Sequence, residues 1–194
     1  MCLIEYRCGI GGARRGADLL GLHVSVYISV NEDFEARLVV RHAWPETLIV
    51  KNFADHMDEI FSYIELKGCR VTQGLLVSSL PLPNTQRTDM SSKDASCTYF
   101  VAAQQFLSDV SARFKHIGWN TIVENTPSLA LDHKDAYARY NGSLGGMPLH
   151  MCSETSSGLR RPRIFWPSWA FKGSSDVTVT PGRLWVNTKF PVNC

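Results

Sequence analysis

The start of the chain alternates strand-like runs with a glycine turn and a helix-compatible stretch. Cys2 to Tyr6 is a short, largely apolar run, and the turn Gly9-Ile10-Gly11-Gly12 follows it. Ala13 to Leu20 is compatible with a helix, and His23 to Val30 has strand character. Strands that alternate with helices favour a mostly parallel sheet covered on both faces. These residues therefore predict an α/β fold.

The same alternation continues along the chain. Helical spacing of apolar residues extends over Phe34 to Trp44, Asp55 to Leu66 and Thr98 to Phe114, and strand-like runs cover Thr47 to Val50, Val71 to Val77 and Thr121 to Val123. Ligands of such sheets bind beyond the carboxyl ends of the strands. The polar stretch between Leu80 and Ser96 is too long for a simple connector, and loops of this length are often functional or disordered.

Composition limits the classes of protein to which the chain can belong. With 194 residues and 44% apolar content it can bury one sizeable core, which favours a single domain. A net charge of +2 neither supports nor excludes a nucleic acid partner. The six cysteines lack the paired spacing of zinc sites, which predicts reduced thiols and no metal site. Without a secretory signal or an apolar run of about 18 residues, we expect an intracellular protein with no membrane partner.

Four segments occur in an order that resembles one enzyme family. They are Gly9-Ile10-Gly11-Gly12, the loop around Pro81, Val123-Glu124-Asn125 and Arg161-Pro162-Arg163-Ile164-Phe165-Trp166. In order and spacing they resemble the glycine motif, Pro-Cys loop, Glu-Asn motif and Arg-x-Arg motif of cytosine-5 DNA methyltransferases. Arg-Pro-Arg followed by Phe-Trp is most similar to the de novo branch. The resemblance implies a Rossmann-like, mostly parallel sheet of the S-adenosylmethionine-dependent methyltransferase type.

The resemblance also implies methyl transfer from S-adenosylmethionine to a cytosine that is flipped out of DNA. In this family a cysteine thiolate adds to C6 of the base, which makes C5 nucleophilic enough to accept the methyl group. Leu82 stands at the position of that cysteine, directly after Pro81. A leucine side chain has no lone pair, and neither Cys8 nor Cys97 is an obvious substitute. The resemblance therefore implies catalysis that is impaired by the loss of the nucleophile.

Three further residues match chemical groups of the family's base pocket. Glu124 matches the glutamate that contacts the cytosine ring nitrogen and supports its protonation. Arg161 and Arg163 match the two arginines that hold the base and its phosphate, a task suited to a guanidinium fork. The alternatives are a surface carboxylate at a strand end for Glu124 and a solvated basic patch for the arginines.

The positions expected to bind the methyl donor depart from the family pattern. The resemblance assigns donor binding to Gly9, Ile10, Gly11, Gly12, Asn31, Glu32 and Asn52. Arg7 stands where the family usually has a phenylalanine near the adenine. Asn31 aligns with the acid for the ribose hydroxyls, although a shift of one residue would place Glu32 there. Asp55 is the alternative to Asn52 for the next acid. An amide lacks the charge-assisted strength of a carboxylate towards hydroxyls, so weaker donor binding is expected.

The few residues that follow these motifs favour a fragment, a truncated gene product or a reduced homologue. We expect residues 1–171 to form a methyltransferase-like catalytic domain, and residues 172–194 are too few for the family's target-recognition region. The first hypothesis is an impaired DNA (cytosine-5) methyltransferase-like protein that binds DNA weakly and is nuclear if its source is a eukaryote. One alternative is a noncatalytic interaction or regulatory module that binds a protein partner. Another is a donor-dependent enzyme whose chemistry lies elsewhere on the same frame.

Overall fold

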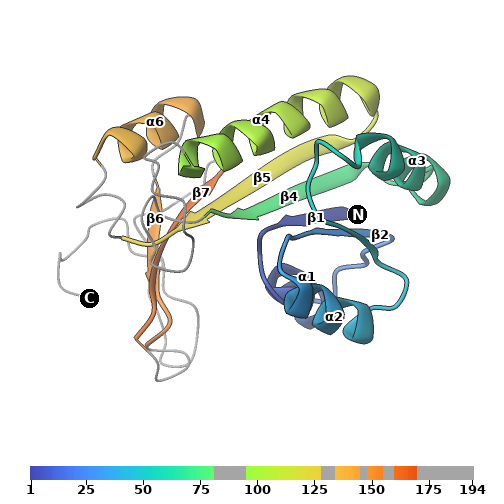
Figure 1. The fold of residues 1–194 in the computed structure, drawn as a ribbon, viewed down its shortest axis with the longest axis horizontal. Coiled ribbons are helices and arrows are strands. Elements are labelled where there is room, and N and C mark those ends of the chain that lie inside the picture. Colours follow the sequence, from blue (N-terminus) through green and yellow to red (C-terminus); the bar gives the residue numbers. More distant parts are fainter. Residues whose placement is uncertain (81–94, 128–133, 145–147, 155–159, 170–194) are drawn as a thin grey trace. The chain divides into compact units, whose positions relative to one another are not determined.

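The structure is a computed structural model that describes residues 1–80, 95–127, 134–144, 148–154 and 160–169 of the chain. The described strands are β1 (Cys2–Tyr6), β2 (Val26–Val30), β3 (Leu48–Val50), β4 (Gln73–Ser79), β5 (Gly118–Asn125), β6 (Leu149–Cys152) and β7 (Pro162–Pro167). The described helices are α1 (Gly12–Leu19), α2 (Phe34–Ala43), α3 (Met57–Lys67), α4 (Ala95–Arg113) and α6 (Lys134–Leu144). The strands form a sheet in the order β3-β2-β1-β4-β5-β7-β6 (Figure 1).

The chain divides into two compact units. The first comprises residues 1–80 and 97–121, and the second comprises residues 81–96 and 122–194. In the first unit β1 pairs in parallel with both β2 and β4, and β2 pairs in parallel with β3. Every residue of β1 and β2 is buried. Such continuous burial is expected for parallel strands that are covered on both faces, and it explains why both strands are mostly apolar.

Helices cover both faces of the sheet in the first unit. Figure 1 shows α1 and α2 on one face and α3 and α4 on the other. On the α1 and α2 side, Tyr27 of β2 packs with Ala17 of α1 and Val40 of α2. On the other side, Phe53 stacks on Phe106 of α4, with ring centres 3.9 Å apart. Because β1, β2 and β3 are parallel neighbours, the loops that follow them lie together at the carboxyl edge of the sheet.

The second unit contains an antiparallel ladder. Strand β7 pairs antiparallel with both β5 and β6. The buried Trp166 of β7 packs against Tyr137 and Tyr140 of α6, with ring centres 5.8 and 5.5 Å away. Trp166 Nε1 also donates a hydrogen bond of 2.7 Å to Asn141 Oδ1. Both interactions hold α6 against β7.

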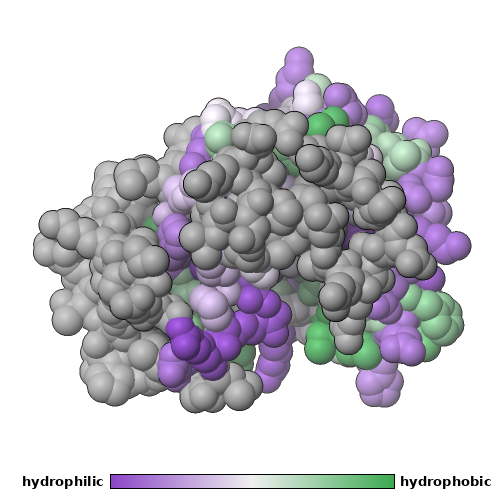
Figure 2. Space-filling view, turned by 60° about the vertical axis from the view of Figure 1, so that its left-hand side comes forward, coloured by the Kyte–Doolittle hydropathy of each residue, from purple (hydrophilic) through white to green (hydrophobic). Residues whose placement is uncertain are grey.

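Hydrophilic and hydrophobic side chains are interspersed on the face of the molecule shown in Figure 2, as far as its residues are described. Within the described ranges, none of the helices combines the length and the apolarity needed to cross a membrane.

The α/β fold and the mostly parallel sheet predicted from the sequence are confirmed. Element bounds differ in places, since β2 begins at Val26 rather than His23, and β5 extends well beyond the predicted run of Thr121 to Val123. The sequence did not predict α6, β6 or β7. Strand β7 has a proline at each end, and proline within a run argues against a strand because it donates no ladder hydrogen bond.

Candidate functional site

A glycine turn connects the carboxyl end of β1 to the start of α1. Gly9 and Gly11 have φ values of 71° and 90°, in the left-handed region that glycine enters without steric cost. Gly11 is also the N-cap of α1. A Cβ atom at Gly11 would overlap the ring of Trp44 and approach the hydroxyl of Tyr27 to 3.1 Å. The backbone of the turn therefore packs directly on these rings, and only glycine fits at Gly11.

A buried carboxylate supports this turn from below. Glu5 of β1 is 1% exposed, and its Oε1 accepts a hydrogen bond of 2.5 Å from the backbone N–H of Arg14 in the first turn of α1. Burial raises the pKa of Glu5 to about 7, although the hydrogen bond from Arg14 opposes that shift. Sequence reasoning missed Glu5, but a signal was present, because a carboxylate within an apolar strand needs a buried partner.

Asn31 joins the end of β2 to the glycine turn. It is 8% exposed, and its Nδ2 donates a hydrogen bond of 3.3 Å to the carbonyl of Gly9. Its Oδ1 accepts one of 3.1 Å from the N–H of Asp33, just before α2. Asn31 therefore lies beside the turn, where a donor contact was predicted, but both ends of its amide already bind protein groups.

Glu32 and Arg7 form an ion pair next to the same turn. Arg7 Nη1 lies 2.9 Å from Glu32 Oε2, and the two side chains are 17% and 51% exposed. The guanidinium carbon of Arg7 lies 3.8 Å from the ring centre of Tyr99 in α4, within the range of a cation–π interaction. Arg7 has a φ of 59°, and its N–H donates a hydrogen bond of 2.9 Å to Val30 O. Sequence reasoning missed Tyr99, because nothing local to it indicates this contact.

Asn52 and Asp55 belong to one turn between β3 and α3. Asn52 Oδ1 accepts a hydrogen bond of 2.9 Å from the N–H of Asp55, and Asn52 Nδ2 donates one of 2.9 Å to Asp55 Oδ2. The sequence presented these residues as alternatives for one role. The structure instead brings both to the same place, and Asn52 orients the exposed carboxylate of Asp55.

In the second unit, Glu124 and Arg163 form an ion pair across neighbouring strands. Arg163 Nε of β7 lies 2.7 Å from Glu124 Oε1 of β5, with the two side chains 24% and 20% exposed. The ladder creates this proximity, since Glu124 is in register with Phe165, two residues along from Arg163. Arg161 is exposed and precedes β7. The structure therefore brings together two of the three residues predicted for base binding.

The candidate residues thus form two groups, one in each unit. The glycine turn, Asn31, Glu32 and Asn52 belong to the first unit, and the pair of Glu124 and Arg163 belongs to the second. Leu82 lies outside the described residues. Among the described side chains, no group of three or more His, Cys, Asp and Glu residues could hold a metal ion.

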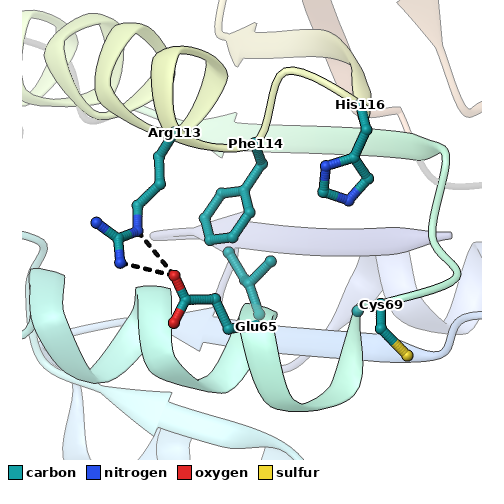
Figure 3. Close-up of a pocket in the computed structure, with 7 residues that line it drawn as sticks. Glu65, Cys69, Arg113, Phe114 and His116 are labelled. Carbon is teal, nitrogen blue, oxygen red and sulfur yellow. Dashed lines mark hydrogen bonds and ion pairs between the residues drawn. The ribbon is translucent and has the colours of Figure 1, made fainter.

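A pocket of about 290 Å³ lies elsewhere in the first unit, at the carboxyl ends of α3 and α4 (Figure 3). Glu65, Cys69, Arg113, Phe114 and His116 line it together with Ile64 and Gly68. Arg113 closes one side through a contact of 2.6 Å between its Nη2 and Glu65 Oε1. These helices end where β4 and β5 begin, so the pocket lies at the opposite edge of the sheet from the glycine turn and is not part of it.

Comparison with known proteins identifies the fold. No sequence profile of a protein family matches the chain, and no curated protein sequence matches it. The structure is similar to that of Dnmt2 methyltransferase from S. pombe, with a TM-score of 0.54 and 12% identity over 89% of this chain and 50% of that chain. It is also similar to a mutant DNMT2 from Spodoptera frugiperda, with a TM-score of 0.51 and 16% identity over 89% of this chain and 53% of that chain. The chain thus spans about half the length of either neighbour. The similarity confirms the predicted Rossmann-like fold of the S-adenosylmethionine-dependent methyltransferase type.

Proposed function

We propose that this chain is a cytosine-5 methyltransferase-like domain that binds S-adenosylmethionine at its glycine turn and that is impaired in methylating DNA. The observation that carries the proposal is the ion pair of Glu124 and Arg163, 2.7 Å apart. These residues come from two separate motifs of the resemblance, and their packing into one pair supports a shared role. The fold of the two structural neighbours supports the same conclusion.

The glycine turn suits the donor because its backbone is open to a ligand. A Cβ atom at Gly9 or at Gly12 would meet nothing within 4 Å, so the turn offers free space beside the first amides of α1. Such amides carry partial positive charge and favour the carboxylate end of a ligand such as S-adenosylmethionine. When bound, the donor supplies the methyl group. Asp55, exposed and oriented by the hydrogen bond from Asn52, is a carboxylate on this edge that can accept hydrogen bonds from polar groups of the donor.

The pair of Glu124 and Arg163 suits a cytosine ring. Glu124 would hold a proton at the ring nitrogen, and Arg163 keeps its carboxylate oriented. Arg161, exposed beside β7, would bind the phosphate of weakly held DNA. The nucleophile is the missing group, since Leu82 offers no thiolate. Methyl transfer is therefore expected to be absent or very slow.

Donor binding is tested by isothermal titration of the full chain with S-adenosylmethionine. Gly9→Asp should abolish the binding, because it puts a side chain and a negative charge into the open turn. Gly21→Asp is the matched control, since Gly21 has a similar φ of 69° and equally open surroundings but lies at the far end of α1. No heat from the unchanged chain at about 1 mM donor, a concentration that as a Kd corresponds to a binding free energy of about −4 kcal/mol, would refute donor binding.

Catalysis is tested by transfer of a labelled methyl group to cytosine-containing DNA. We expect no transfer by the unchanged chain, and transfer by Leu82→Cys that is lost again in Leu82→Cys/Glu124→Gln. Transfer by the unchanged chain would contradict the impaired state. Absence of transfer by Leu82→Cys when it binds both the donor and the DNA would contradict the role of Leu82 as the missing group.

A noncatalytic interaction module is the second candidate, and one observation favours it. Asn31 and Glu32, both predicted donor contacts, are engaged by Gly9 and Arg7. A site whose polar groups are satisfied by the protein needs no cofactor. Arg7→Ala would release the carboxylate of Glu32. If the glycine turn is a donor site, this change should strengthen binding of S-adenosylmethionine. If the chain is a module without a cofactor, the variant should still not bind the donor.

A further inference from the structure

The outward side of α2 exposes the apolar residues Phe34 and Leu38 among charged and polar ones. Ala36 and Val40 are buried against the sheet, and the helical period places Leu38 directly opposite them. Phe34, Leu38 and Val39 are 63%, 46% and 45% exposed. Surface helices normally carry charged and polar residues on this side. The α2 outer face is defined as Phe34, Glu35, Leu38, Arg41 and His42. Its central Leu38 is exposed, and the guanidinium carbon of Arg37 lies 5.8 Å from the ring centre of Phe34, so the opposite side of that ring remains for a partner.

Charges are placed symmetrically around the apolar centre of this face. Glu35 lies near the start of α2, and Arg41 and His42 lie in its last turn. When two α2 helices meet antiparallel about Leu38, the period of the helix brings Glu35 of one copy beside His42 of the other. The same arrangement brings Arg41 of one copy beside the ring of Phe34 in the other, a favourable cation–π contact. The face is thus complementary to itself.

We propose that the α2 outer face binds a second copy of this chain, with the two α2 helices antiparallel and Leu38 packed on Leu38 at the two-fold axis. Such an interface is isologous, so each stabilising pair occurs twice. Glu35 near the start of α2 and Arg41 and His42 near its end also interact favourably with the helix dipole, which would explain them without any partner. The exposed Leu38 between them has no such role, and it is the feature that favours an interface.

Helix α1 can extend this interface. It lies beside α2, joined by the hydrogen bond of 3.1 Å from Trp44 Nε1 to Asp18 Oδ2. Leu19 and Leu20, at the carboxyl end of α1, are 71% and 77% exposed. A stable interface needs roughly 1,000 Å² of buried surface, more than one short helix supplies. The proposed interface therefore includes the apolar end of α1 for the additional area, and a reversible dimer is the expected product.

Sedimentation equilibrium of the full chain tests the proposal over concentrations up to about 1 mM. We expect a monomer–dimer equilibrium, and Leu38→Asp should weaken it by at least about tenfold, as expected for a central interface residue. Leu66→Asp is the matched control, because Leu66 lies on α3 and is 75% exposed. A chain that is monomeric at every concentration would overturn the proposal, and so would a dimer that Leu66→Asp disrupts as strongly as Leu38→Asp.

A charge exchange identifies the occupant of the face as a second copy. Glu35→Lys should weaken the dimer, since it replaces the carboxylate that accepts a hydrogen bond from His42 of the other copy with a cation. Glu35→Lys/His42→Glu should restore it, because the exchanged charges meet again across the two-fold axis. Equal helix content by circular dichroism separates this effect from a change in the dipole of α2. Failure of the double variant to restore association, with helix content unchanged, would contradict the antiparallel arrangement.

Discussion

Replacing Gly11 with alanine tests how the glycine turn is held. Gly11 has a φ of 90°, where a side chain costs about 1–2 kcal/mol. Its Cβ would also overlap the Trp44 ring. That ring cannot move freely, because it lies edge-on to Tyr27 at 5.6 Å and donates a hydrogen bond to Asp18.

The two costs can be added to give an expected loss of stability. Overpacking of a fixed ring typically costs about 1–3 kcal/mol. Together with the backbone strain, Gly11→Ala should lower the free energy of unfolding by about 2–5 kcal/mol, a large fraction of the total for a domain of this size. Gly9→Ala, with a φ of 71° and no atom within 4 Å, should lower it only by the strain of about 1–2 kcal/mol.

Urea unfolding followed by circular dichroism measures these differences, provided that the denaturant slope is unchanged. Gly12→Ala is the control, since Gly12 lies in α1 with open space around it, and alanine there should be neutral or stabilising by up to about 1 kcal/mol. Equal losses for Gly9→Ala and Gly11→Ala would refute the contact with Trp44. A loss in Gly12→Ala as large as that in Gly11→Ala would refute the whole argument.

Three further predictions concern buried groups. Burial raises the pKa of Glu5 from 4.5 to about 7, so its contribution to stability is fully present below pH 4.5 and is lost as the pH rises past 7. The free energy of unfolding should decline by about 3 kcal/mol across this pH range when it is measured by urea unfolding. The decline should disappear in Glu5→Gln. If it persists in that variant, other groups cause it. Gly74→Ala should destabilise by about 1–3 kcal/mol in the same assay, because its Cβ would overlap the Trp119 ring, and an unchanged midpoint would show that this ring can move. Asn141→Ala removes the acceptor of the hydrogen bond from Trp166 Nε1 and should lower the free energy of unfolding by about 1–3 kcal/mol. The double change Trp166→Phe/Asn141→Ala should lower it by less than the sum of the two single changes. Strict additivity would argue against this hydrogen bond.

Much of the first unit could be predicted because its signals are local. Buried parallel strands are apolar runs, and β1 was predicted with its observed bounds. The glycine turn was recognisable because only glycine enters the left-handed region without strain. Residues that the resemblance assigned to separate motifs, Glu124 and Arg163, also lie together.

The remaining features depend on contacts between distant segments. Tyr99 meets Arg7 only because α4 covers the sheet beside β1, and no local pattern indicates such a neighbour. Strand β7 was missed because its prolines oppose strand pairing, and its partner β5 overrides that preference. Asn52 and Asp55 were treated as rivals, although a turn binds them together.

The sequence alone determined the α/β class and the position of the glycine turn, because hydrophobic period and glycine conformation are properties of single residues and their near neighbours. Tertiary structure alone decided that Glu32 pairs with Arg7, that Glu5 is buried beneath the turn and that Leu38 faces outward. Burial and ion pairing depend on which segments the folded chain brings together, and that choice is made by the packing of the whole core.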